Sequence, residues 1–279
     1  MDSHQADQGV CAVDSHFHLD KLLQRTRTNS LEEAERRDGS PLDFALTAAV
    51  ANFVFPELWD SVDEETMDAD RRIFRSYGIH PSRAVAHPED LVTELSRLLQ
   101  HPRAVAVGEV GLDFRKETKE VEKSAQRETL RQSLLLARLL SKPVIVHCRG
   151  GPRAERECLE VMSACLDRFH RIHRHCFNGT PEQLATFSAA FPNSVFGFAG
   201  ALLRPGSPAV KAVQTIPLER LVLETDAPYL VPPTVRGEVA RPWMVYEVAK
   251  FIARRRGLRP TAVLDQASRN AIWFYGLAV

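Results

Sequence analysis

The sequence predicts an α/β protein built as a (β/α)8 barrel, also called a TIM barrel. Strand-like and helix-like segments alternate along the whole chain, eight such units fit within 279 residues, and no shift in composition marks a boundary. We therefore expect one barrel domain over residues 1–279. A doubly wound open sheet is the alternative, but it usually carries a glycine-rich phosphate loop after its first strand. The segment HFHLDKLL at residues 16–23 contains no such loop.

The predicted strands are short apolar runs bounded by turn residues. Several are nearly continuous in Val, Ile, Leu and Ala, which is typical of strands that are covered on both faces. In chain order they are residues 10–18, 45–54, 75–80, 104–111, 143–148, 171–177, 194–200 and 221–226.

The clearest predicted helices have apolar residues at steps of three and four. They are residues 90–100, 124–142, 155–169, 180–191 and 242–257. Thr180 before Pro181 is typical of a helix start, and Gly257 is typical of a helix end. Residues 24–40 are predicted as a long first βα loop with one short helix, and residues 231–242 as the last βα loop.

Amino-acid composition limits which partners the protein can bind and where in the cell it is expected. Lys and Arg together equal Asp and Glu together at 36 each, so any nucleic acid must be held by a local patch or by a metal. The five cysteines are odd in number and lack CxxC pairs, which is typical of reduced thiols inside the cell. The start of the chain has no signal-peptide pattern, and no run is long enough to span a membrane. We expect a soluble, intracellular monomer, cytoplasmic or nuclear, without membrane partners.

Metal-binding side chains fall at the ends of the predicted strands, where a barrel collects its functional groups. A single close pair of histidines is more often a surface accident, but six of the eight strands end in His, Asp or Glu. Buried imidazoles and carboxylates, as in VIVHC and VGEVG, are costly unless they are satisfied. Together these ends predict a metal site formed by His16, His18, His80, Glu109, His147, His175 and Asp226.

This set of ligands is too large for one ion. A tetrahedral ion uses about four ligands, whereas two ions that share a carboxylate use about six. Such two-metal sites activate water and stabilise both oxygens of a displacement. Glu109 comes from a central strand and is the expected bridge.

The sequence also predicts whether the side chains next to these ligands point into the barrel or out of it. Glu224 shares a strand face with Asp226, and His173 shares one with His175, so both are expected inside the barrel. Alternation turns Cys148 and Cys176 away from the metals, toward the helices.

Six motifs follow one another along the chain. They are DSHFHLD (14–20), YGIHPSRA (77–84), AVGEVGLDF (106–114), PVIVHCRG (143–150), HRHCFNGT (173–180) and LVLETDAPYL (221–230). In this order they closely resemble the TatD family of metal-dependent hydrolases in the amidohydrolase superfamily. The resemblance spans about residues 12–278, and phrases such as IHRHCFNG look most like animal TatD-domain proteins.

The resemblance implies a role for each matching residue. His16 and His18 would bind one ion with Asp226, His147 and His175 would hold the second, and Glu109 would bridge. His80 would contact the scissile phosphate, with Arg149 as a second phosphate contact. Family members are described as Mg2+-dependent DNases, commonly 3′ to 5′ exonucleases, and some act on RNA or deacylate D-aminoacyl-tRNA. The chain departs from the family pattern at RGEVARP (236–242) and GFAGALL (197–203), two segments expected to border the substrate cleft.

The predicted activity is therefore phosphodiester hydrolysis at the 3′ end of single-stranded DNA or RNA by two divalent ions. Asp226 is the expected general base, and His80 and Arg149 would neutralise the phosphoryl oxygens. The alternatives are a carboxylic ester hydrolase, such as a D-aminoacyl-tRNA deacylase, and a non-catalytic binding module. Mg2+ is the expected metal, with Mn2+ or Zn2+ as alternatives. Loop residues expected to hold a strand are Arg204, Arg236 and Arg241, with Phe114 and Tyr229 for stacking.

Overall fold

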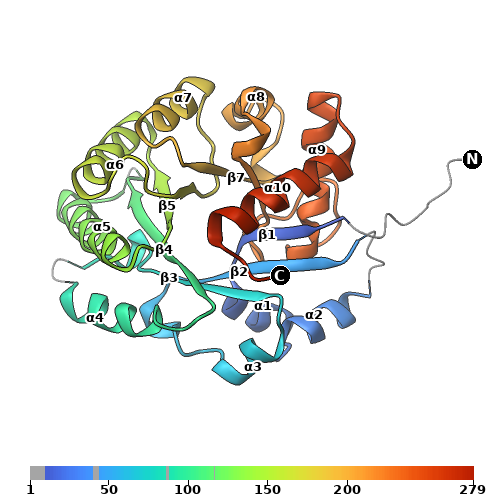
Figure 1. Cartoon of the computed structure of the whole chain (residues 1–279), viewed down its shortest axis with the longest axis horizontal. Coiled ribbons are helices and arrows are strands. Elements are labelled where there is room, and N and C mark those ends of the chain that lie inside the picture. The colour runs from blue at the N-terminus through green and yellow to red at the C-terminus, as the bar shows by residue number, and fades with distance from the viewer. Residues whose placement is uncertain (1–9, 40–43, 86–87, 116) are drawn as a thin grey trace, which may run out of the picture.

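A computed structural model of the chain describes residues 10–39, 44–85, 88–115 and 117–279. Eight parallel strands form one sheet in the order β1 to β8, with helices around it (Figure 1). Backbone hydrogen bonds from Asp226 to His16 and from His18 to Ala227 bring the β8 end of the sheet against β1. The strands are β1 (Ala12–Phe17), β2 (Leu46–Phe53), β3 (Ile73–Tyr77), β4 (Ala104–Asp113), β5 (Val144–Arg149), β6 (Ile172–Arg174), β7 (Val195–Ala199) and β8 (Leu221–Glu224).

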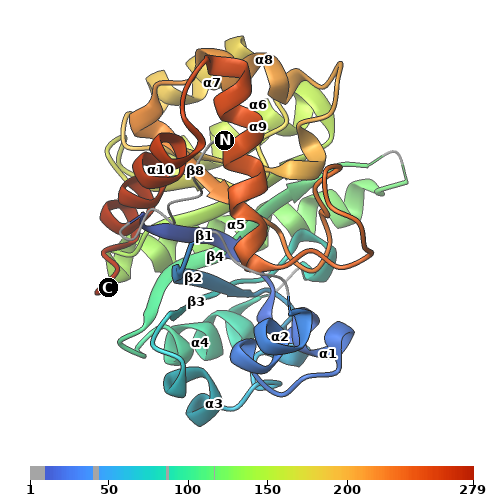
Figure 2. The same ribbon diagram turned by 90° about the vertical axis from the view of Figure 1, so that its right-hand side faces the viewer.

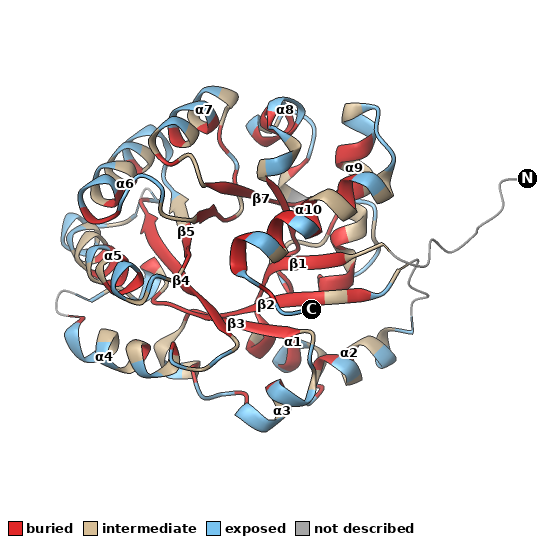
Figure 3. Ribbon diagram, viewed as in Figure 1, coloured by how far each residue is buried: buried red, intermediate tan, exposed pale blue. Residues whose placement is uncertain are grey.

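The helices cover the outside of this nearly closed barrel, which confirms the predicted fold class. Figure 3 shows strands that are buried almost throughout and helices that bury only one face. The α-helices are α1 (Leu19–Thr26), α2 (Leu31–Asp38), α3 (Glu64–Ala69), α4 (Glu89–Leu98), α5 (Glu120–Leu140), α6 (Gly151–Cys165), α7 (Pro181–Ala190), α8 (Pro208–Thr215), α9 (Val245–Arg256) and α10 (Pro260–Tyr275). Short 3-10 helices include η1 (Pro56–Leu58), η2 (Pro81–Arg83), η3 (Gly200–Leu202), η4 (Leu218–Arg220) and η5 (Pro242–Met244).

The structure contains all of the predicted helices. Two of them begin or end at the residues that the sequence indicated. Thr180 accepts a hydrogen bond from the backbone of Gln183 at the start of α7, and Pro181 is its first residue. Gly257 ends α9 with a φ of 65°, which glycine adopts at no steric cost. The short helix predicted within residues 24–40 is α2, but α1, which begins directly after His18 and extends into this segment, was not predicted; residue 40 lies outside the described residues.

Four helices were not predicted: α1, α3, α8 and α10. The first three have eight residues or fewer, too short for an apolar repeat to stand out. The longer α10 buries one face that includes Val263, Leu264, Ala267, Ala271 and Phe274, so its apolar residues do recur at helical steps and the sequence analysis overlooked them.

The interior of the barrel has an apolar end and a polar end. At the N-terminal ends of the strands, inward residues such as Val50 and Ile145 pack against Phe274, Tyr275 and Leu277 from the end of α10 and the residues after it. Figure 2 shows α10 at one end of β1 and α1 at the other. This apolar plug leaves the opposite end of the barrel for polar groups.

Two irregularities in the strands turn polar residues toward that end. The pairing of β4 with β5 skips Glu109, since Gly108 pairs with Ile145 and Val110 with Val146. The pairing of β1 with β2 has a similar irregularity between Asp14 and Phe17. An extra residue of this kind redirects its side chain and is common beside active sites.

No helix among the described residues has the length and apolar character needed to cross a bilayer.

Candidate metal centre

The C-terminal ends of the strands bring the six predicted metal ligands into one cluster. His16 Nε2 lies 3.4 Å from Glu109 Oε2 and 3.6 Å from Asp226 Oδ1. His18 Nε2 lies 3.3 Å from Asp226 Oδ1 and 3.4 Å from His16 Nε2. His18 Nδ1 is 3.0 Å from the carbonyl oxygen of Asn52, which turns Nε2 toward the cluster. These four ligand side chains therefore face one point.

Glu109 stands between this group and a second one. Its Oε2 faces His16 and His18, whereas its Oε1 lies 2.5 Å from His147 Nδ1 and 3.7 Å from His175 Nε2. The Glu109 side chain is 3% exposed, so these imidazoles replace water around it. One oxygen directed at each group is the arrangement that a bridging carboxylate requires.

The spacing of the donor atoms fits a metal ion. A tetrahedral ion with bonds of about 2.1 Å holds its ligand atoms roughly 3.4 Å apart. Five separations among the Nε2 atoms of His16 and His18, Glu109 Oε2 and Asp226 Oδ1 range from 3.3 to 4.0 Å. His147 and His175 offer two further nitrogens to the other oxygen of Glu109. The donor set therefore fits two divalent ions that share Glu109.

The buried carboxylates control which imidazoles carry protons. Burial lowers the pKa of His16 to about 4. Burial also acts to lower the pKa of His175, but the carboxylates of Glu224 and Glu109 outweigh it and raise that pKa to about 10. Without metal the cluster therefore holds a proton on His175, which a metal ion must displace before it can bind there.

A buried chain of polar groups holds His175 in place. His175 Nδ1 lies 3.2 Å from Glu224 Oε2, and His173 Nε2 lies 3.1 Å from the same oxygen. His173 Nδ1 is hydrogen-bonded to the Tyr275 hydroxyl of α10 at 2.6 Å. A Cβ atom at Gly197 would lie 2.3 Å from Glu224 Oε2, so the strand beside this chain has room only for glycine. A carboxylate on the far nitrogen of an imidazole fixes the ring and makes it a better ligand.

Comparison with known protein families shows to which family this chain belongs. The model of the family described as TatD-related DNase matches residues 13–276. The chain belongs to this family. The prediction made from the six motifs is thus confirmed, including the assignment to metal-dependent hydrolases and nucleases.

Several TatD relatives align with most of the chain. The human 3′-5′ RNA nuclease TATDN2 is 32% identical over 95% of this chain, which spans only 35% of the length of TATDN2. An uncharacterized metal-dependent hydrolase TatD of Mycobacterium tuberculosis is 31% identical and matches 95% of this chain and 98% of its own length. A 3′-5′ ssDNA/RNA exonuclease TatD of Erwinia billingiae is 34% identical, with 70% and 74% covered.

A solved TatD-family structure has the same fold. The crystal structure of YJJV, a TatD homologue from Escherichia coli K12, superimposes with a TM-score of 0.74 at 21% identity and covers 95% of this chain and 98% of that one. At this identity the likeness supports the TIM barrel and nothing finer.

His80 lies at the edge of the cluster of predicted metal ligands. It was predicted to end the third strand, but it lies beyond that end. β3 ends at Tyr77, and His80 precedes η2. The backbone N–H of Ser82 donates to His80 Nδ1 at 3.1 Å, so the neutral ring carries its proton on Nε2, which lies 3.7 Å from Glu109 Oε1. Burial lowers the pKa of His80 to about 4. His80 can therefore donate a hydrogen bond to a phosphoryl oxygen but does not bring the positive charge that we expected.

The predicted basic residues differ in availability. Arg149 is exposed at the end of β5, and Arg204 and Arg236 are exposed on loops. Arg241 lies on the predicted last βα loop, but its Nε lies 2.7 Å from Asp38 Oδ1, so its guanidinium is already paired. Sequence reasoning also overlooked Arg115, which is exposed just beyond β4 with Nε 3.1 Å from Asp113 Oδ2. Among the described residues, the exposed cations at the ends of β4 and β5 are therefore Arg149 and Arg115, of which Arg115 is paired with Asp113.

The two predicted stacking residues also differ. Phe114 is only 8% exposed, and Lys123, Arg127 and Arg153 all lie within 5.8 Å of its ring centre, so a base has no open face to stack on. Tyr229 is 44% exposed, and its ring lies edge-on to His18 with centroids 5.6 Å apart. Of these two residues, Tyr229 is the one with an exposed ring beside the cluster.

One cysteine prediction was wrong. Cys148 packs against the core as expected. Cys176, however, has a φ of 45°, so the strand alternation that should turn it outward has already ended. Its backbone N–H donates to Glu224 Oε1 at 2.5 Å, and its thiol lies beside His175 and Glu224. Burial and the nearby carboxylates of Asp226 and Glu224 raise the pKa of this thiol well above its usual value, so it stays protonated.

Proposed function

We propose that this chain is a two-metal phosphodiesterase that shortens single-stranded DNA or RNA from its 3′ end. The observation that carries the proposal is the position of Glu109, with one oxygen toward His16 and His18 and the other toward His147 and His175. The names of the human and Erwinia relatives, which describe 3′-5′ nucleases, support the same substrate class. We propose that one domain carries this activity.

In phosphodiester hydrolysis, each residue of the centre would have a separate role. Divalent ions at this centre would supply an acidic water and positive charge for the phosphoryl oxygens. Asp226 Oδ1 faces the imidazoles, and no hydrogen bond or ion pair among the described residues occupies Oδ2, which we assign as the acceptor of the water's proton. His80 Nε2–H would donate to a phosphoryl oxygen, and Arg149 would attract the strand.

We propose magnesium as the physiological metal, with manganese as a substitute. Buried imidazoles bind Zn2+ or Mn2+ more tightly, whereas the carboxylates Glu109 and Asp226 suit Mg2+, which is abundant in cells. We also propose that the protein is an intracellular monomer, because nucleic acids and reduced thiols are found inside cells.

The test is a panel of end-labelled single-stranded DNA, duplex DNA, RNA and D-aminoacyl-tRNA, each incubated with Mg2+, Mn2+, Zn2+ or a chelator. We expect stepwise shortening of single strands from the 3′ end, lost on chelation. Asp226→Asn should lower turnover by about two orders of magnitude or more. Asp90→Asn is the matched control, because Asp90 is an exposed residue of α4. Hydrolysis of aminoacyl-tRNA alone, or equal rates on circular and linear single strands, would overturn the proposal.

A further inference from the structure

Two cations lie over one aromatic ring at the C-terminal ends of the strands. The ring belongs to Phe55, between the end of β2 and η1. Lys21 Nζ of α1 lies 4.8 Å from the centre of this ring, and the guanidinium carbon of Arg83 in η2 lies 5.1 Å from it. Ammonium and guanidinium groups are attracted to the face of such a ring. Phe55 therefore holds both cations together at this end of the barrel.

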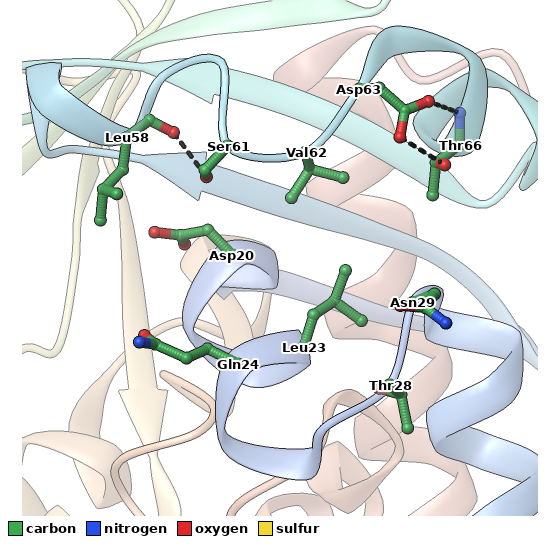
Figure 4. A pocket seen from close by; sticks show the side chains of 10 residues that line it. All are labelled: Asp20, Leu23, Gln24, Thr28, Asn29, Leu58, Ser61, Val62, Asp63 and Thr66. Carbon is green, nitrogen blue, oxygen red and sulfur yellow. Dashed lines mark hydrogen bonds between the residues drawn. The ribbon is translucent and has the colours of Figure 1, made fainter.

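The two cations lie beside the cluster of predicted metal ligands. The helices α1, η1 and η2 follow β1, β2 and β3, three neighbouring strands, and Figure 4 shows α1 facing the segment after β2. The centre of the Phe55 ring is 5.9 Å from that of His80, whose Nε2 lies 3.7 Å from Glu109 Oε1. One aromatic ring therefore separates the cations from His80, the residue proposed to contact the scissile phosphate.

Both cations keep donors that a ligand can reach. The Lys21 side chain is 21% exposed, and its Nζ lies 3.9 Å from Asp20 Oδ2, too far for a hydrogen bond. This Nζ has no hydrogen bond within the described part of the chain and is not enclosed by protein. Arg83 is 48% exposed, and of its guanidinium nitrogens only Nε is hydrogen-bonded to a described residue, at 2.7 Å from Glu57 Oε1. The ammonium group of Lys21 and the Nη groups of Arg83 can therefore donate to a bound anion.

A carboxylate of the chain is already attracted to both cations. Burial acts to raise the pKa of Glu57, but the hydrogen bond from Arg83 and the charges of Arg83 and Lys21 lower it. The Glu57 side chain is 49% exposed, and an exposed ion pair of this kind contributes little to stability. A phosphodiester has two free oxygens that can accept ionic hydrogen bonds from two cations. A phosphate can therefore take the place of this carboxylate.

The direction of shortening determines which phosphate this is. When the last nucleotide is removed from a 3′ end, the scissile phosphate is the last one of the strand, so the next phosphate lies on its 5′ side. His80 would contact the scissile phosphate, and the two cations lie one ring beyond His80. Arg115 is exposed too, but its partner Asp113 is only 4% exposed, so that pair is harder to separate.

We propose that Lys21 and Arg83 bind the phosphate on the 5′ side of the scissile one, in place of the Glu57 carboxylate. Phe55 is a positioning residue, because it holds both cations over its ring. The proposal rests on the proposed nuclease function and adds to it: the enzyme binds two successive phosphates of a strand, and Glu57 competes with the second.

The experiment follows removal of the last nucleotide from a 5′-labelled single strand. The linkage on the 5′ side of the scissile one is either an ordinary phosphodiester or an uncharged methylphosphonate. We expect the wild type to prefer the charged linkage by about tenfold in kcat/KM, because the methylphosphonate loses the ionic hydrogen bonds to both cations. A strand with its methylphosphonate far from the 3′ end is the control, and its kcat/KM should stay close to that of the unmodified strand.

Three variants should change this preference, whereas a defect in folding or metal content would slow both linkages alike. Lys21→Met and Arg83→Gln should each lower the preference to about threefold or less. Glu57→Gln should raise it roughly twofold to fivefold, because it removes the competing charge. Arg168→Gln is the matched control: Arg168 is also exposed and lies 5.2 Å from an aromatic ring centre, that of Phe169, but it precedes the N-terminal end of β6.

The outcomes distinguish the two proposals. Equal wild-type rates on the two linkages, or Lys21→Met and Arg83→Gln variants that keep the wild-type preference, would overturn the second phosphate site and leave the nuclease proposal standing. A Glu57→Gln variant with a lowered preference would overturn the competition, because Glu57 would then hold Arg83 in place for the phosphate. A wild type that hydrolyses no nucleic acid would overturn both proposals.

Discussion

Replacing Glu224 with glutamine tests how the barrel controls its metal ligands. The carboxylate is fully buried and contacts the far nitrogen of His175, so the change keeps its volume and removes its charge. The pKa of His175 should fall from about 10, because Glu224 is the carboxylate that raises it most. Loss of a carboxylate behind a ligand typically weakens metal binding by about 10- to 100-fold, or about 1.4–2.8 kcal/mol.

The metal-free protein should lose stability as well. A buried hydrogen bond to a charged group contributes about 1.5–3 kcal/mol, so we expect the free energy of unfolding to fall by roughly that amount. Calorimetric titration with Mn2+ measures the affinity, and thermal unfolding in a chelator measures the stability. Glu219→Gln on η4 is the control, since that side chain is exposed. A Glu224→Gln variant that binds Mn2+ as tightly as the wild type would refute the view that Glu224 supports His175.

Three further predictions concern the same centre. Gly197→Ala should push Glu224 off His175 and weaken metal binding by about tenfold or more, and unchanged affinity would show that the strand yields instead. Glu109→Gln should lower metal content and cut hydrolysis by about two orders of magnitude, as measured by elemental analysis and strand shortening; full metal content would argue against a bridge. Metal binding at pH 7 should release protons, because a pKa of about 10 leaves His175 protonated in the metal-free protein. Affinity should therefore rise with pH toward that value, and titrations in buffers of different ionisation enthalpy would detect the proton.

The side chains that meet in the cluster could be predicted from the sequence because local patterns mark them. Polar side chains that end apolar strands are conspicuous, as with His147 in VIVHC and Glu109 in VGEVG. The alternation of a strand also predicted that His16 and His18 share a face. These inferences need only the strand period and the rule that barrel sites lie at the carboxyl ends of strands.

Other parts of the site depend on geometry that no local pattern expresses. The left-handed backbone at Cys176 reverses the direction that alternation predicts. His173 and Tyr275 are 102 residues apart in the chain and meet only when the barrel is complete. The pocket between α1 and the segment that joins β2 to α3 (Figure 4) likewise requires α1, a helix that was not predicted, to face that segment.

The contact between α10 and the barrel interior also affects when, during synthesis, the chain becomes able to bind metal. The ribosome releases β1 through β8, with every proposed ligand, before it releases Phe274 and Tyr275. Until those residues emerge, the N-terminal end of the barrel lacks its plug and His173 lacks its hydroxyl partner. Domains made from the N-terminus onward often fold as they emerge, but the polar chain behind His175 is complete only with the final turn of α10. A nascent chain can therefore expose a full set of ligands and still hold metal poorly.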